Sequence, residues 1–534
     1  MRISHAAESY EGIASINAVG MAVFESSGLR DLIDRRCRYD PGKRILSPGM
    51  VVKALIGPMF NTAGKFPLYS LREAYNTAPT DRLFGPDVEK DDLYDNALAR
   101  GLDSLFDADL EKLFSECSSA IAKKYGFDSH VFHLDATDVS VTGMEHAPDK
   151  EGAAIPLHNG HPKDMRVKLM QYELQVATDS NRILRYMKPY SGNVSDCEMD
   201  SDTIGAFADA FPESERKGMI IVGDCKLPTS ENIAKMIDCG FGFVSKCSGN
   251  FKDNAKKKIV ELSLDAEMHG CGKNGLRMAD FDMDLKLSKE RTERLRFMAF
   301  RRDAKVSAET EKVRAEARMK ADAAAKEFVG KRYRKRKDAE KAASKAVPKS
   351  GLYILETDFA YYESDSPYES GWWEIKTMAF VSEDGVRRAA ERRSTDVLIT
   401  NLGRAGMSNE KLLELYNHEY KVEQSFRLMK SGMGMDSVFL QTPSRENAMM
   451  FVISIAVLVS NIADAVFRRE RVMLRGKQLT MHRLAYSLLT TNVEYSRGEN
   501  TLRLRGPPES TDGFFEITDI LQINPQYLLG YLSD

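Results

Sequence analysis

The chain has 534 residues, of which 43% are hydrophobic and 29% charged, and its formal net charge is −3. This length exceeds what one hydrophobic core usually supports, so about three or four domains are expected, and the composition excludes a globally disordered chain. The near-neutral charge sum does not identify a partner, because basic residues can still gather locally at Arg35–Arg36, Lys256–Lys258 and Lys331–Lys337.

The compartment is predicted from cysteine usage and apolar segments. The seven cysteines are scattered and odd in number, which favours a reducing compartment over a disulfide framework. Met1–Tyr10 is polar and predicts no signal peptide. The apolar segment Ala448–Val459 is too short to span a bilayer and is followed by polar residues. We therefore expect a buried helix there and a cytoplasmic protein.

Residues 1–128 are predicted to form a helical N-terminal domain. Leu98–Phe106 and Leu110–Phe114 carry apolar residues at helical spacing, and Pro41–Gly42 and Pro48–Gly49 mark turns. The pattern is equally compatible with a helical bundle that has no specific function.

Residues 129–250 change to a strand-like pattern. Val131–Asp135 is a short apolar run that ends in a carboxylate, and Tyr172–Val176 alternates between apolar and polar residues. A turn at Asp179–Asn181 and a further apolar run at Ile183–Met187 complete a predicted hairpin.

The same region continues with a predicted helix at Cys197–Phe211. Met219–Val222 is typical of a strand buried on both faces and leads to Asp224. Ser230 is predicted to cap the next helix, which Gly240 would end before a strand at Phe241–Ser245. Three antiparallel strands followed by alternating helices and strands are the order of a ribonuclease-H-like α/β core.

Residues 251–395 interrupt this core as a predicted insertion domain. Ser288–Ala346 is rich in Lys, Arg, Glu and Ala and is predicted to be helical, most often a sign of a solvated face. Strands are expected at Gly351–Leu355 and Trp373–Val381.

Residues 396–475 are predicted to resume the core. Val397–Thr400 has the pattern of a strand, a helix is expected from Ser408 to about Met433, and a buried helix at 448–466. The C-terminal tail, residues 476–534, carries little interpretable pattern.

Three carboxylates are candidate catalytic residues. Asp135 and Asp224 each end an apolar strand, so neighbouring strands would place both at one edge of the sheet. Glu423 lies on the helix after Ser408, with Tyr416 and Lys430 seven residues to either side on the same face. Two Asp and one Glu are hard oxygen ligands that suit Mg²⁺ or Mn²⁺.

Each of these residues also has an ordinary structural explanation. A strand-terminal Asp is more often a turn or cap residue, Tyr416 is compatible with core packing, and Arg427 with an ion pair to Glu423. A zinc site is a minor alternative, but its candidates lack a Cys-x2-Cys pair: Cys239, Cys247, His269 and Cys271.

The stretches around the acids resemble DDE transposases of bacterial insertion sequences, in the branch with a Tyr-x2-Arg-x3-Glu-x6-Lys signature and a long insertion before the Glu. An Asn96–Asp103 segment and Leu68–Ser70 are also similar to the N-terminal domain of that subgroup. Five stretches occur in the family's order: His133–Thr137, Gly160–Arg166, Ser191–Asp196, Val222–Asn232, and the helix with Tyr416, Glu423 and Lys430.

The chain departs from the family pattern at three places. Glu419 stands where the signature has Arg, with Lys421 and Arg427 nearby as possible substitutes. Lys226 replaces a Gly after the second Asp, and Pro162 replaces a Ser. These changes leave the acids in place but put full activity in question.

The resemblance implies a function and a set of roles. Asp135, Asp224 and Glu423 would hold two Mg²⁺ ions, with Mn²⁺ as a substitute, for cleavage at element ends and strand transfer into target DNA. Tyr416, Arg427 and Lys430 would contact DNA.

Further expectations concern the other domains. Trp372 and Trp373 are predicted to stack on an extruded base, with core packing as the more frequent alternative. The N-terminal domain would bind terminal inverted repeats mainly through phosphates, and a homodimer would act on paired ends at the nucleoid of a bacterium or archaeon. A catalytically disabled DNA-binding relative and a ribonuclease-H-like nuclease without strand transfer remain alternatives.

Overall fold

The structure is a computed structural model that divides into two compact units. Unit 1 comprises residues 1–227, 238–242 and 416–534, and unit 2 comprises residues 228–237 and 243–415. The structure describes the following residues: 10–61, 70–141, 155, 158–159, 170–249, 251–271, 275–346, 351–365, 368, 370–418, 426, 428–429, 440, 442–499, 501–511, 513–523 and 527–528.

The N-terminal part of unit 1 is mostly helical, as the apolar spacing predicts. Two of its helices begin at side-chain caps: Ser47 Oγ accepts from the amide of Met50 at 3.2 Å, and Asp109 Oδ1 from that of Lys112 at 3.1 Å. Its elements are β1 (Tyr10–Ala14), α1 (Ser15–Ser26), α2 (Leu29–Arg36), α3 (Pro48–Met59), α4 (Leu71–Ala74), α5 (Thr80–Phe84), the 3-10 turn η2 (Lys90–Asp92), α6 (Asp95–Phe106) and α7 (Leu110–Lys124).

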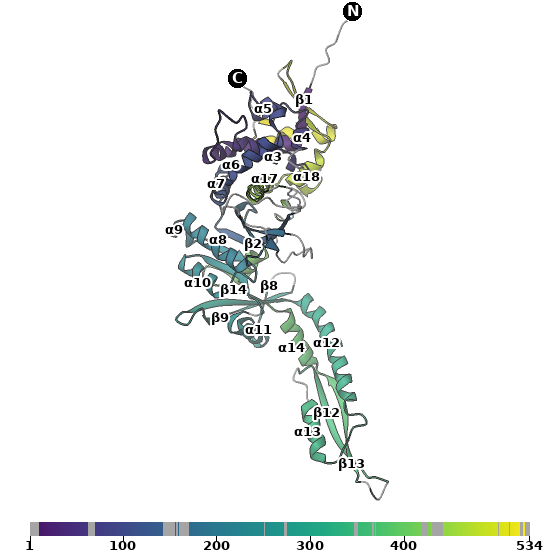
Figure 1. Cartoon of the computed structure of the whole chain (residues 1–534). Helices are drawn as coiled ribbons and strands as arrows, with labels where there is room; N and C mark the ends of the chain where they lie inside the picture. Colours follow the sequence, from purple (N-terminus) through teal and green to yellow (C-terminus); the bar gives the residue numbers. More distant parts are fainter. Residues whose placement is uncertain are drawn as a thin grey trace, which may run out of the picture. The chain divides into compact units, whose positions relative to one another are not determined.

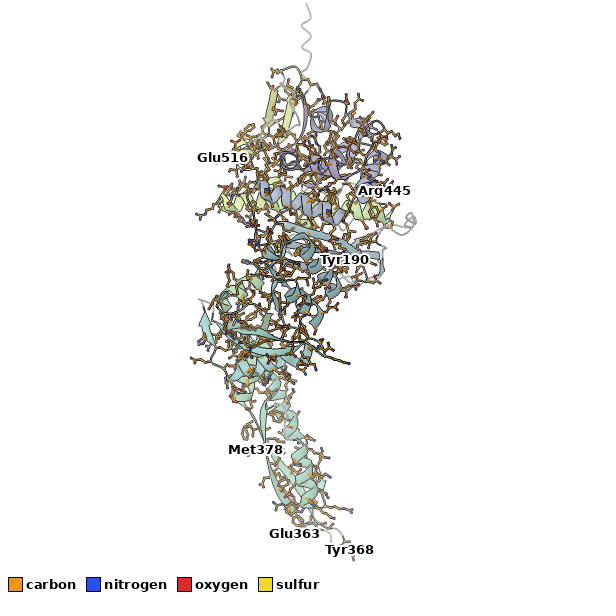
Figure 2. The ribbon with its side chains drawn as sticks, turned by 90° about the vertical axis from the view of Figure 1, so that its left-hand side faces the viewer. Tyr190, Glu363, Tyr368, Met378, Arg445 and Glu516 are labelled. Atoms are coloured by element: carbon orange, nitrogen blue, oxygen red, sulfur yellow. The ribbon has the colours of Figure 1, made fainter. Side chains whose placement is uncertain are left out.

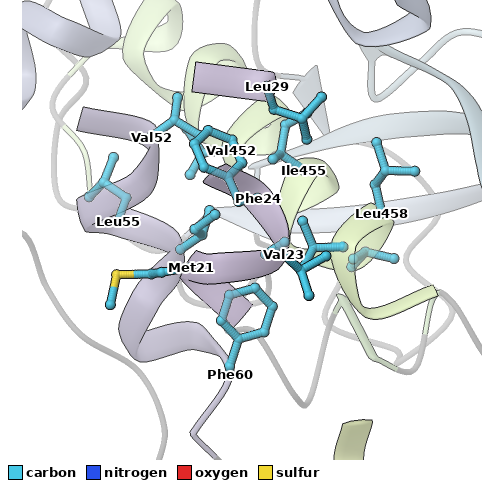
Figure 3. Close-up of a cluster of buried hydrophobic side chains, with 14 of the residues drawn as sticks. Met21, Val23, Phe24, Leu29, Val52, Leu55, Phe60, Val452, Ile455 and Leu458 are labelled. Carbon is cyan, nitrogen blue, oxygen red and sulfur yellow. The ribbon is translucent and has the colours of Figure 1, made fainter. Parts of the chain in front are cut away.

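Helix α17 (Pro443–Arg469) is the core element of unit 1. It is long and apolar enough to cross a membrane, but 94% of its most apolar window is buried inside the protein. Side chains of α1 and α3 pack against it, and Figure 3 shows Phe24 and Val52 beside Val452 and Ile455. The prediction of a buried helix is therefore confirmed, and it begins earlier than the apolar run because Pro443 occupies the first turn.

The C-terminal tail folds back onto the N-terminal helices, which the sequence did not reveal. β1 pairs with β17, and Arg497 bonds both Glu11 and Asp81. The tail contains β15 (Met473–Leu474), β16 (Lys477–Gln478), α18 (Met481–Ser487), β17 (Asn492–Ser496), β18 (Thr501–Arg505), α19 (Pro508–Thr511) and α20 (Phe514–Ile520).

A mixed sheet forms the other layer of unit 1 (Figure 1). β2 pairs antiparallel with β4 and parallel with β6, while β5 pairs antiparallel with β4 on its other side. The spatial order β5-β4-β2-β6 and these directions match the ribonuclease-H-like α/β core predicted from the sequence. The elements are β2 (Val131–Val141), β3 (His158–Asn159), β4 (Met170–Asp179), β5 (Leu184–Ser191), α8 (Asp196–Ala210), α9 (Glu213–Arg216) and β6 (Ile220–Gly223).

The predicted turn between β4 and β5 is organised by one buried carboxylate. Asp179 accepts from the amides of Asn181 and Ile183 at 2.8 and 3.0 Å, and from Arg185 Nε at 2.7 Å. Arg182 has a positive φ of 65° and completes the turn.

Unit 2 contains a second group of strands in the order β7-β14-β10-β9-β8, whose pairings are antiparallel. The strands expected at 241–245 and 397–400 are present: the first is displaced by one residue, and the second begins one residue earlier. The elements are α10 (Ser230–Asp238), β7 (Gly242–Lys246), the 3-10 turn η3 (Lys252–Asn254), α11 (Ala255–Asp265), β8 (His269–Cys271), β9 (Leu276–Lys286), β10 (Thr292–Arg302), β14 (Asp396–Thr400) and α15 (Asn409–Asn417).

An elongated part of unit 2, here called the arm, covers residues 303–394. It extends away from β9 and β10 (Figure 1), and it packs helices on one face of the sheet β11-β13-β12. Its elements are α12 (Asp303–Lys326), β11 (Arg332–Tyr333), α13 (Arg336–Ala346), β12 (Tyr353–Tyr362), β13 (Trp372–Val381) and α14 (Glu383–Ser394).

Two local predictions are wrong. The helix-prone stretch 288–346 contains strand β10 before α12 and strand β11 before α13, because Leu295–Phe300 are buried by pairing with β9 and β14. The side-chain cap of α10 is Thr229 and not Ser230, since Thr229 Oγ1 accepts from the amide of Asn232 at 3.1 Å. The helix ends near Gly240, whose φ of 81° suits glycine.

Candidate active site

The pairing of β2 with β6 positions the two predicted aspartates. These parallel strands place His133 opposite Val222. Asp135 and Asp224 each lie two residues further along, at matching positions of neighbouring strands, and both are half-buried. The alternation of side chains along a strand turns Asp135 to the same side of the sheet as His133. The sequence prediction that Asp135 and Asp224 share one edge of the sheet is supported by this register.

Backbone amides orient both carboxylates. Asp135 Oδ1 accepts from the amide of Ala136 at 2.8 Å, and Asp224 Oδ1 from the amide of Lys226 at 2.7 Å. These bonds fix one oxygen of each carboxylate on the adjoining backbone.

Helix α8 contributes two further carboxylates to the same place. Ser195 caps the helix by accepting from the amide of Glu198 at 3.4 Å. Asp196 and Asp200 are one turn apart and therefore on the same face. Asp200 is 6% exposed and accepts from Gln175 Nε2 of β4 at 2.8 Å.

The pKa of Asp200 reports the charge of this cluster. Burial is the main cause that raises it, the negative charges of Asp224, Asp196 and Asp135 add to the rise, and the hydrogen bond from Gln175 opposes it, so that the pKa lies at about 7. A carboxyl group with this pKa accepts a proton near neutral pH because burial, and to a lesser extent the nearby carboxylates, disfavour its negative charge. The four aspartates therefore lie within electrostatic reach of one another.

Lys226 brings a positive charge to this cluster. Its ammonium group forms an ion pair with Asp196. Burial alone would lower the pKa of Lys226, but the hydrogen bond to Asp196 and the charges of Asp196 and Asp224 outweigh it and raise the pKa. The Cys197 thiol donates to the carbonyl oxygen of Lys226 at 3.3 Å, and burial and the nearby acids raise the thiol's pKa.

The donor set fits a divalent cation. Carboxylate oxygens are the ligands that Mg²⁺ and Mn²⁺ prefer. Burial is the main cause of the raised pKa of Asp200, and the charges of the neighbouring aspartates add to it, so negative charge gathers here that a divalent cation would compensate. Within the described residues, no three Asp, Glu, His or Cys side chains form a complete metal-binding group. Of the residues considered for the minor zinc alternative, Cys239, Cys247 and His269 have side chains that the structure describes, and they form no such group either.

The remaining predicted residues of the signature helix have mixed outcomes. Tyr416 lies in the last turn of α15 and is half-buried. Glu423, Arg427 and Lys430 lie outside the described residues, as does Glu419. The structure therefore does not test the third acid or its phosphate-contacting neighbours.

The two tryptophans lie in the arm and point to opposite faces of its sheet. Trp373 packs beside the buried cluster around Phe328 and Ile375, with its ring centroid 5.2 Å from that of Tyr361. Its surroundings agree with the core-packing alternative. The face that carries Trp373 is covered by α13, whose Ala339 and Ala343 belong to that cluster.

Trp372 lies on the uncovered face. The Arg332 guanidinium is 4.0 Å from the centroid of its ring, and the Tyr362 ring stacks at 6.0 Å with an interplanar angle of 16°. These two residues come from β11 and β12, on opposite sides of β13. An extruded base that stacks on Trp372 would have to displace Arg332 or Tyr362.

The tip of the arm is more accessible than either tryptophan. Tyr368 is 96% exposed, and Figure 2 shows it with Glu363 at the end of the β12–β13 hairpin, beyond Met378. Met378 is itself 60% exposed. An aromatic side chain that stacks on a base need not be a tryptophan, so this position widens the set of candidates.

Sequence reasoning missed the role of α8 and noted Lys226 only as a departure. Asp200 had a detectable signal, because it follows Asp196 by four residues just after a Ser cap. The bond between Lys226 and Asp196 had none, because 30 residues separate the partners.

Two carboxylates at matching ends of neighbouring parallel strands, in a ribonuclease-H-like sheet, define the architecture of the metal-dependent polynucleotidyl transferases. The family described as "Transposase DDE domain" matches residues 126–459, more than half of the chain, and the chain therefore belongs to this family. The protein is a DDE transposase that acts on DNA.

Two other comparisons are less informative. A domain of unknown function, DUF4277, matches residues 12–119, and the curated proteins contain no match. Among solved structures, the chain is similar to one titled "Cryo-EM structure of piggyBac transposase synaptic complex with hairpin DNA". That similarity has a TM-score of 0.37 and 9% identity over 90% of this chain and 82% of the other.

Proposed function

We propose that this transposase cleaves DNA at the ends of its element and joins the freed 3′ ends to target DNA, in cut-and-paste transposition. The observation that carries the proposal is the matched pair Asp135 and Asp224 in a chain of the DDE family. The nearby negative charge around Asp200 supports a site that works with a bound cation.

Asp135, Asp224 and Glu423 would hold two Mg²⁺ ions, with Mn²⁺ as a substitute. When bound, the ions would activate the attacking oxygen and stabilise the leaving oxygen in an in-line phosphoryl transfer. The amides of Ala136 and Lys226 would keep the first two carboxylates oriented for this task.

DNA contacts are proposed for the signature helix and the arm. Lys430 would bind a phosphate as a point charge, with Arg427 and Tyr416 beside it. Trp372 would serve as a stacking surface only after Arg332 or Tyr362 moves, whereas Trp373 is the weaker candidate because it packs against the arm's buried cluster.

The proposed roles of the other domains follow from the family. Residues 1–128 would bind the terminal inverted repeats, residues 251–395 would act as the insertion domain, and residues 129–250 and 396–475 would form the catalytic core, with residues 476–534 as a tail. A homodimer would act on paired element ends at the nucleoid of a bacterial or archaeal cytoplasm.

The decisive experiment is cleavage of a labelled duplex that carries the element ends and flanking DNA, with Mg²⁺ or Mn²⁺. We expect nicks at the element boundary that require the metal, and a loss of at least about a thousandfold in Asp224→Asn and Glu423→Ala because the ions lose a ligand. Asp202→Asn is the matched control, since Asp202 lies on α8 but contacts Lys188 and Tyr190.

Three other outcomes would contradict parts of the proposal. Tight DNA binding without cleavage by the wild type would indicate a disabled DNA-binding relative and direct attention to Glu419. Cleavage without strand transfer would indicate a nuclease. Full activity in Glu423→Ala would show that another residue supplies the third acid.

A further inference from the structure

Lys226 is tied to the site by three separate bonds. Its ammonium group pairs with Asp196, its amide donates to Asp224 Oδ1 at 2.7 Å, and its carbonyl accepts from the Cys197 thiol at 3.3 Å. Two of these bonds join the loop that carries Asp224 to the first turn of α8. A lysine at this position therefore contacts the carboxylate cluster with its side chain while its backbone orients one of the candidate ligands.

The ion pair is too exposed to be explained by stability. The side chains of Lys226 and Asp196 are 51% and 35% exposed. Pairs this accessible to solvent contribute roughly 0–1 kcal/mol to folding, because water screens them and both side chains lose rotamer freedom. The local electric field is the relevant effect instead. The positive charge sits on Asp196, which is one of the three carboxylates whose charges add to the burial that raises the pKa of Asp200.

We propose that Lys226 is a positioning residue that acts as an internal counter-ion of the metal site. This inference rests on the proposed function. Before metal binds, the ammonium group on Asp196 reduces the repulsion among Asp135, Asp224 and Asp200. When a divalent cation binds, the same ammonium group repels it, so Lys226 keeps the site formed but limits its metal affinity.

The two members of the ion pair have opposite predicted effects. Removing the positive charge in Lys226→Met leaves the carboxylates with less compensation, so they bind a divalent cation more tightly. Removing the negative charge in Asp196→Asn frees the ammonium group to approach Asp224, so the cation binds more weakly. A bond with a purely structural role would give the same direction of change in both variants.

The test is a titration of the metal-free full-length protein with Mn²⁺ at low ionic strength, in which calorimetry measures the Mn²⁺ affinity. We expect Lys226→Met to bind Mn²⁺ about three- to tenfold more tightly than the wild type. Lys226→Arg, which keeps the charge, should stay within about twofold, and Asp196→Asn should bind more weakly. The gain in Lys226→Met should shrink as KCl is added, because salt screens half-exposed charges.

Lys217→Met is the matched control. Lys217 pairs with Glu213 on the surface at 2.9 Å, so its replacement causes the same change in net charge without touching the cluster. Unchanged Mn²⁺ affinity in this control, together with tighter binding in Lys226→Met, would support the inference. Equal gains in both variants would show a general charge effect and overturn it.

The melting temperature in chelator provides a readout that does not depend on activity. Lys226→Met should melt lower than the wild type without metal and show a larger rise in melting temperature when Mn²⁺ is added.

Failure of the inference and failure of the proposed function are distinguishable. Asp135→Asn removes a proposed metal ligand. If this variant bound Mn²⁺ as tightly as the wild type does, both the proposed metal site and the inference would be overturned. If Asp135→Asn abolished Mn²⁺ binding but Lys226→Met bound Mn²⁺ with unchanged or weaker affinity, only the inference would be overturned.

Discussion

Asp200 carries no proposed catalytic role, yet it gives the site a measurable pH dependence. Its pKa rises from the ordinary value of 3.8 to about 7 in the folded protein, mainly because the group is buried. The folded state therefore holds a proton that the unfolded state has released between these two pH values. The free energy of unfolding contributed by this group falls as the pH rises through that window.

The replacement Asp200→Asn should remove this dependence. The asparagine oxygen can still accept from Gln175, while no charge develops at higher pH. Without metal, we expect the variant to gain several degrees of melting temperature relative to the wild type between pH 5 and pH 8. Thermal denaturation in chelator at both pH values measures the gain, with Asp202→Asn as control. A constant difference at both pH values would contradict the assignment of the titration to Asp200.

At the scale of elements, the packing of α6 against α3 depends on a glycine. A Cβ atom at Gly101 would lie 2.5 to 2.7 Å from the Val51 side chain, which is stiff because it is β-branched. Alanine is the better helix former by about 1 kcal/mol. Overpacking costs about 1–3 kcal/mol and opposes that gain.

We therefore expect Gly101→Ala to lower the free energy of unfolding by up to about 2 kcal/mol, the overpacking cost less the helix-propensity gain. Urea denaturation of the full-length protein checks this value. Asn96→Ala, at an exposed position of the same helix, should be neutral or slightly stabilising. A Gly101→Ala variant as stable as Asn96→Ala would show that the two helices separate at little cost.

At the scale of the whole molecule, a net charge of −3 conceals an uneven distribution. Arg334, Lys335 and Lys337 of the arm are exposed, and in the described part of the chain no acidic side chain lies within ion-pair distance of them. Lys337 also lies in the first turn of α13, where the helix dipole disfavours a positive charge. Helix stability does not explain these residues, and we therefore predict that they contact DNA phosphates.

Replacing these three residues with Gln should reduce the salt dependence of DNA binding. Each phosphate contact contributes about 0.9 to the slope of log K against log salt concentration, so three contacts predict a decrease of about two to three. Fluorescence anisotropy with duplex DNA at several KCl concentrations measures this slope. The control variant replaces Lys312, Arg314 and Lys320, which already pair with glutamates on α12. Equal slopes for both variants would argue against DNA binding by this end of the arm.

The sequence by itself determined the local features of this protein. Alternating and uninterrupted apolar runs predicted β4, β5, β6 and β14, and the ends of two such runs identified Asp135 and Asp224. These features depend on neighbouring residues and on the periodicity of strands and helices, which a single chain segment reveals. The resemblance to a family supplied the transposase function, and the family match confirmed that class. Glu423, Arg427 and Lys430 remain predictions.

Only the tertiary structure decided how distant segments meet. Pairing with β9 and β14 made β10 a strand within a helix-prone stretch, and β1 joined a tail that had shown no clear pattern. The register of β2 and β6 placed Asp135 and Asp224 at matching positions of neighbouring strands. Helix α8 brought Asp196 and Asp200 close to them, and Lys226 pairs with Asp196. The physical reason is that burial, register and charge–charge distances depend on contacts between residues far apart in the chain, and no local pattern encodes those contacts.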